Sequence, residues 1–143
     1  MKNAILSLAM LLLSVAAFGQ SERTPAQQMT DKLTAKYNLT EEQQAEMLTI
    51  QQRTFNDLEE ITHLKKSNIS LHIQKMRALK MGMEGSMERI LNEDQRAILA
   101  QEKAAFRQQK SVLYSDLKAK GASAQQIDYQ ICQLEEAALT GTQ

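Results

Sequence analysis

The sequence predicts an all-α protein. Helix-favouring residues (Ala, Gln, Glu, Lys, Leu and Met) dominate, only 4% of the residues are aromatic, and the single proline is Pro25. Apolar residues recur at the spacing of one helix face, and no segment alternates as a strand does. We therefore expect an elongated bundle of four to five helices, with long antiparallel helices.

Residues 1–19 predict an export signal. They combine a basic start, an apolar stretch over residues 4–18 and a small-x-small cleavage site at residues 17–19. The apolar stretch is too short for a confident membrane span. We expect a mature chain that starts at Gln20, forms a single all-helical domain over 20–143, lies in the periplasm and does not insert into the membrane.

Three shorter helices and one long helix should make up this domain. We expect the shorter ones over 26–37, ended by Asn38, over 92–120, stopped by Gly121, and from a capping box at Ser123 onwards. The last of these could pack on the core or serve as a flexible end that meets other proteins.

The long helix is predicted over residues 40–81. Its apolar residues keep one phase at 100° per residue, so Ser67 and Asn68 should not interrupt it, and Gly82 and Gly85 should end it. Such a helix would be a rod of roughly 60 Å, whereas a compact chain of this size is roughly 35 Å across. We therefore expect a thin, curved homodimer in which a second copy covers the apolar stripe.

Neither charge nor motifs indicate an enzyme or a nucleic-acid-binding protein. Without Lys2, sixteen basic side chains stand against seventeen acidic ones, which gives no overall attraction to nucleic acid. His63 and His72 would lie on opposite sides of one helix, and no glycine-rich phosphate loop occurs. We expect no catalysis and no cofactor. Cys132 is the only cysteine, so it either packs as a small apolar residue or bridges two copies.

Two pentads, at residues 39–43 and 91–95, share the pattern of a helix start. In each, Thr or Asn can cap the helix while a Gln three residues later bonds back to the cap, and acidic residues between them favour the helix dipole. The predicted motif residues are Leu39, Thr40, Gln43, Leu91, Asn92 and Gln95.

This pair of pentads resembles the LTxxQ pair of the Spy/CpxP family of periplasmic proteins, over roughly residues 29–120. The first pentad matches fully, and the second has Asn92 where the family has Thr. The resemblance implies an envelope-stress chaperone that works without ATP as a holdase, a cradle-shaped antiparallel dimer that binds unfolded client proteins on a basic, apolar concave side. The alternative is a periplasmic accessory regulator of a sensor, tuned by metal.

A local excess of positive charge marks the candidate binding surface. Five Lys or Arg residues and no acid lie between Ile61 and Met83. Lys65 and Lys80 fall inside the apolar stripe, where a closed core would exclude charge. The segment is either an accessible face that attracts acidic, partly unfolded chains or a dimer core from which the lysines reach solvent. The expected client-binding residues are Lys65, Ile69, Ile73, Met76, Arg77, Lys80 and Met83.

Four methionines also crowd this region, at positions 76, 81, 83 and 87. Thioether side chains adapt to irregular packing, and clustered thioethers can also take up Cu(I). We predict ordinary packing and no metal site.

Overall fold

The computed structural model describes residues 22–142, all of whose regular elements are helices, as predicted for an all-α bundle. The predicted export signal and the mature start at Gln20 lie outside these described residues. The helices are α1 (Pro25–Tyr37), α2 (Glu41–Thr62), α3 (Leu64–Ser67), α4 (Ile69–Ile90), α5 (Glu93–Ala119) and α6 (Ala124–Thr140).

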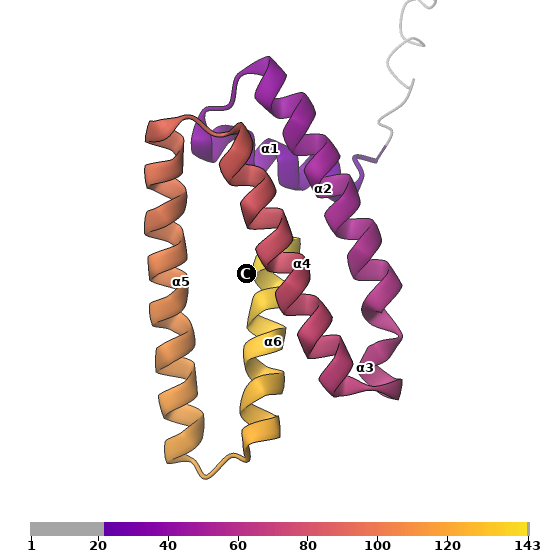
Figure 1. Cartoon of the computed structure of the whole chain (residues 1–143), viewed down its shortest axis with the longest axis vertical. Coiled ribbons are helices and arrows are strands. Elements are labelled where there is room, and N and C mark those ends of the chain that lie inside the picture. Colours follow the sequence, from indigo (N-terminus) through magenta and orange to yellow (C-terminus); the bar gives the residue numbers. More distant parts are fainter. Residues whose placement is uncertain (1–21, 143) are drawn as a thin grey trace, which may run out of the picture.

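Two helical hairpins make up the bundle (Figure 1). In the first, α2 and α4 run antiparallel and are joined by the short α3, while α1 packs on α2. In the second, α5 runs along one side of the molecule and α6 returns antiparallel to it, packed on α4. The two hairpins also meet through α1, because Lys32 Nζ donates to the carbonyl oxygen of Gly141 at the end of α6 (3.1 Å).

The rod predicted over residues 40–81 is wrong, because the chain turns back near Asn68. Asn68 leaves the helical region, with φ −156° and ψ 83°. Its side-chain oxygen accepts from the backbone N–H of Leu71 (3.1 Å) and so caps α4. Nδ1 of the buried His72 donates to the carbonyl oxygen of Ile61 (3.1 Å), which satisfies a carbonyl at the end of α2. The polar Ser67-Asn68 pair thus marks a turn between two helices.

The phase of the apolar stripe could not reveal this turn. Each arm of a helical hairpin needs its own apolar face, and the two faces pack on each other whether or not their phases match. Leu58 and Ile61 of α2 are buried together with Ile73 and Met76 of α4 inside one chain. The homodimer was predicted because a rod of this length could not bury its apolar stripe within one chain. Since α2 and α4 fold back on each other, the structure gives no support for that prediction.

Gly82 and Gly85 do not end the helix either, since α4 continues to Ile90. A glycine inside a helix costs about 1 kcal/mol relative to alanine. Packing offsets this cost here, because Met83 is packed against the core and Met87 is only 2% exposed.

The other helix boundaries follow the predictions. Asn38 ends α1 in the left-handed conformation (φ 52°), Gly121 follows α5 with φ 77°, and Ser123 caps α6 in a capping box. A further capping box, formed by Thr24 and Gln27, opens α1 and had not been predicted.

The core consists of two clusters. The first joins α2, α3, α4 and α6 and contains Leu58, Ile61, Leu64, Ile73, Met76, Cys132 and Leu139. The second joins the end of α1 to the ends of α2, α4 and α5 that lie near it, and contains Tyr37, Leu39, Met47, Met87, Leu91 and Leu99. Cys132 is 2% exposed and packs as a small apolar residue, the first of the two predicted roles.

Candidate functional site

The two motifs form capping boxes, as predicted. Thr40 Oγ1 accepts from the backbone N–H of Gln43 (3.2 Å), and Gln43 Oε1 accepts from that of Thr40 (3.0 Å). Asn92 and Gln95 make the same pair of bonds, at 2.9 Å each. The leucine that opens each motif is buried in the second core cluster.

The structure also brings the two motifs together, a contact that the spacing of the motifs does not predict. Gln43 Nε2 donates to Gln95 Oε1 (2.8 Å), and Gln95 Nε2 donates to Gln43 Oε1 (3.0 Å). Each side-chain amide also donates to a backbone carbonyl that lies shortly before the other motif in the chain. Gln43 donates to the Ile90 carbonyl (2.8 Å) and Gln95 to the Tyr37 carbonyl (3.1 Å). We call Gln43 and Gln95 the glutamine clamp. It joins the starts of α2 and α5, and the repetition of the motif was the only sign of it in the sequence.

The residues expected to bind clients do lie together on one side of α3 and α4, and we call them the basic-apolar face: Lys65, Ile69, Ile73, Met76, Arg77, Lys80 and Met83. In this conformation the apolar residues of the face are covered, whereas clients were expected to bind an accessible face; client binding by these residues stays a prediction. Ile73 and Met76 are 7% and 0% exposed, and Ile69 and Met83 are partly buried against the same core cluster. Helices α2 and α6 cover these residues together, since Leu58 and Ile61 of α2 and Cys132 and Leu139 of α6 belong to the same cluster.

The cations of the face are paired, two of them with α6. Lys65 Nζ lies 2.6 Å from a carboxylate oxygen of Glu136, and Arg77 lies 2.8 Å from Asp128. Lys80 pairs instead with Glu84 of its own helix. Burial lowers the pKa of Lys80 from its ordinary value, and the negative charge of Glu135 opposes that shift.

Helix α6 matches this face in chemistry. Over Ala124–Thr140 it carries three acidic residues and no Lys or Arg. Its apolar side buries Ile127, Cys132 and Leu139. Exposed ion pairs contribute only about 0–1 kcal/mol each, so the apolar contacts supply most of the energy that holds α6. An acidic amphipathic helix thus fills a basic amphipathic face.

Phe106 on α5 lies beside this contact, between two lysines. The Nζ atoms of Lys80 and Lys110 stand 4.8 and 5.5 Å from its ring centroid, within the range of cation–π attraction. Lys110 Nζ also donates to Glu135 of α6 (2.8 Å). The side chain of Glu135 is only 4% exposed, so this ion pair ties α6 to α5 from inside the bundle.

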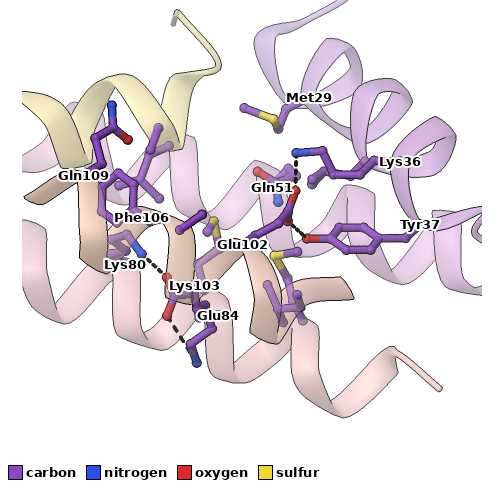
Figure 2. A pocket seen from close by; sticks show the side chains of 17 residues that line it. Met29, Lys36, Tyr37, Gln51, Lys80, Glu84, Glu102, Lys103, Phe106 and Gln109 are labelled. Atoms are coloured by element: carbon purple, nitrogen blue, oxygen red, sulfur yellow. Dashed lines mark hydrogen bonds and ion pairs between the residues drawn. The ribbon is translucent and has the colours of Figure 1, made fainter. Parts of the chain in front are cut away.

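A cavity of about 340 Å³ opens next to Phe106, with lining residues from α1, α2, α4, α5 and α6 (Figure 2). Lys36 and Tyr37 reach the same carboxylate there, that of Glu102. Burial, followed by the hydrogen bond to Glu102, raises the pKa of the Tyr37 hydroxyl. No sequence pattern had indicated this cavity, because residues far apart in the chain line it.

Comparison with known proteins gave no match to a family model, to a curated protein or to a solved structure. Within residues 22–142, no helix is both long and apolar enough to span a membrane. In the same range, no three His, Cys, Asp or Glu side chains come together as a candidate metal site.

Proposed function

We propose that this chain is an ATP-independent periplasmic holdase of the Spy/CpxP type, which binds partly unfolded proteins on the basic-apolar face when α6 leaves it. One observation supports the proposal: the face already holds an acidic amphipathic segment, namely α6. A client segment with acidic and apolar side chains offers the same contacts that Asp128, Glu136 and Leu139 make. Client and α6 would then compete for one surface.

The free energy needed to release α6 is consistent with weak, unspecific binding of clients. Full burial of an aliphatic side chain contributes about 1.5–3 kcal/mol, so the buried apolar residues Ile127, Cys132 and Leu139 give α6 a docking energy of several kcal/mol. Local opening at such a cost lies within the range that folded proteins undergo. Because only the open fraction binds, the apparent affinity for clients is reduced by that fraction.

Aggregation of a chemically denatured client, followed by light scattering without ATP, tests the proposal. In Glu136→Lys two lysines face each other where Lys65 and Glu136 paired. Losing one attraction and adding one repulsion shifts the docking of α6 by about 1–2 kcal/mol, which raises the open fraction roughly 5- to 30-fold. We expect stronger protection of the client by this variant than by the wild type.

Two further variants separate the effect of α6 release from the effect of the altered net charge. Lys65→Glu/Glu136→Lys restores the ion pair with its polarity reversed and should return protection to the wild-type level or below. Glu46→Lys makes the same charge change on an exposed position of α2 and should leave protection unchanged. Equal protection by all four proteins, or none by any, would exclude the proposal. Copurification of one stoichiometric partner would favour a sensor regulator instead.

A further inference from the structure

The cavity of about 340 Å³ exists because α5 packs loosely along most of its length. The buried residues of α5 are Gln95 and Leu99, both near its start. Farther along, Phe106 is only half-buried and Ala105 is exposed, although both line the cavity. This part of α5 therefore borders the cavity without packing closely on the other helices. A volume of this size is in the range of small-molecule sites in proteins.

The interior of the cavity is mainly apolar. Its thioether side chains and larger aliphatic side chains are those of Met29, Leu33, Met83, Met87, Leu99 and Leu139. Methionine side chains are flexible and polarisable, so they adapt to the outline of a hydrocarbon chain. The lining therefore favours an apolar occupant.

Every charged group of the lining is held in an ion pair, and Lys103 pairs in addition with Glu88, which lies outside the lining (2.8 Å). Lys36 lies 2.7 Å from a carboxylate oxygen of Glu102, and Lys103 lies 3.5 Å from one of Glu84, which also pairs with Lys80 (Figure 2). Each carboxylate of this group thus meets at least one cation. A charged ligand would have to break these pairs, whereas a neutral ligand leaves them intact.

One buried polar atom in the lining lacks a partner. Gln51, in the middle of α2, is 0% exposed. Its Nε2 makes only a weak contact with the sulfur of Met47 (3.6 Å), and within residues 22–142 nothing donates to its Oε1. A buried carbonyl oxygen without a donor is destabilising, and native proteins rarely retain one without a reason. A hydroxyl group suits this position, because it can donate to the amide oxygen and also accept from the amide nitrogen.

We propose that the cavity binds a neutral single-chain amphiphile, whose hydroxyl group donates to Gln51 and whose hydrocarbon chain lies among the methionines and leucines. The site shares Lys80 and Met83 with the basic-apolar face, but the proposal does not depend on client binding.

Nuclear magnetic resonance of the full chain, labelled with ¹³C at its methionine methyl groups, tests this assignment. The probes are 1-octanol and its methyl ether, which differ in the hydroxyl donor. We expect both to shift the signals of Met29, Met83 and Met87, which line the cavity, and to leave Met81 unchanged, because it is 73% exposed and lies outside the lining. Octanol should bind about fivefold more tightly, which corresponds to about 1 kcal/mol for one hydrogen bond.

Two variants identify the partner of the hydroxyl group. Gln51→Met keeps the volume of the side chain but removes the acceptor, so it should bind both probes with equal affinity. Ala105 is exposed and also lines the cavity, so Ala105→Phe should fill part of the cavity and weaken the binding of both probes. Circular dichroism checks that the helices persist. Equal affinity of the two probes for the wild type, or no shift at the three lining methionines, would overturn the proposal.

Discussion

Replacing Gln95 with methionine should destabilise the fold more than a single helix cap would. Methionine preserves the volume but removes four bonds: one to the backbone N–H of Asn92, one to the Tyr37 carbonyl and two to the Gln43 amide. Gln95 is 5% exposed, so water cannot fully replace these partners. At about 1 kcal/mol for each lost bond, we expect a loss of about 4 kcal/mol. With an unfolding entropy of about 2.1 cal/mol/K per residue, this lowers Tm by about 16 °C.

Urea denaturation followed by circular dichroism measures this loss. Gln43→Met should cost about 1–2 kcal/mol, because Gln43 is partly exposed and water can take over some of its bonds. The double variant should lose about 1 kcal/mol less than the sum, since each single change already breaks the amide pair. Gln108→Met, at an exposed position of α5, serves as the control. A loss for Gln95→Met no larger than that of the control, or strict additivity in the double variant, would refute the role of the glutamine clamp.

Two smaller predictions concern α6 and the turn. Burial, assisted by Glu135 and Glu136, raises the pKa of the Cys132 thiol to about 11, so alkylation at pH 8 should be on the order of a hundredfold slower in the folded chain than in urea. Because the unfolded thiol ionises near pH 9 while the folded one stays neutral, stability should fall as the pH rises from about 9 to 11, and less so in Cys132→Ala. Asn68→Ala removes the cap of α4 and should cost about 1 kcal/mol, whereas Ser67→Ala, at an exposed hydroxyl, should change stability by less than about 0.5 kcal/mol in urea titrations.

The sequence predicted the helix caps and helix ends, which depend only on residues close together in the chain. A cap needs only residues three positions apart, so the boxes at Thr40, Asn92 and Ser123 could be read directly. The left-handed end of α1 at Asn38 is local in the same way. These features fixed where most helices begin and end.

The predictions failed where contacts between segments far apart in the chain determine the structure. A stripe in constant phase is compatible with a straight rod or with a hairpin, and only the contact of α4 with α2 selects the hairpin. The residues of the basic-apolar face share one side of α3 and α4, but their burial depends on contacts with α2 and α6 that the sequence left open. The glutamine clamp and the cavity likewise join residues more than fifty positions apart, such as Gln43 and Gln95, and no spacing rule predicts such contacts.

Hydrogen–deuterium exchange of the full chain, with and without an excess of unfolded client, tests most directly whether clients replace α6 on the basic-apolar face. We predict faster exchange of the amides of Ala124–Thr140 when client is present, and unchanged or slower exchange in Ile69–Ile90, because the client takes the place of α6. If the client stays soluble while exchange in Ala124–Thr140 is unaltered, α6 remains docked and does not compete with the client for the basic-apolar face.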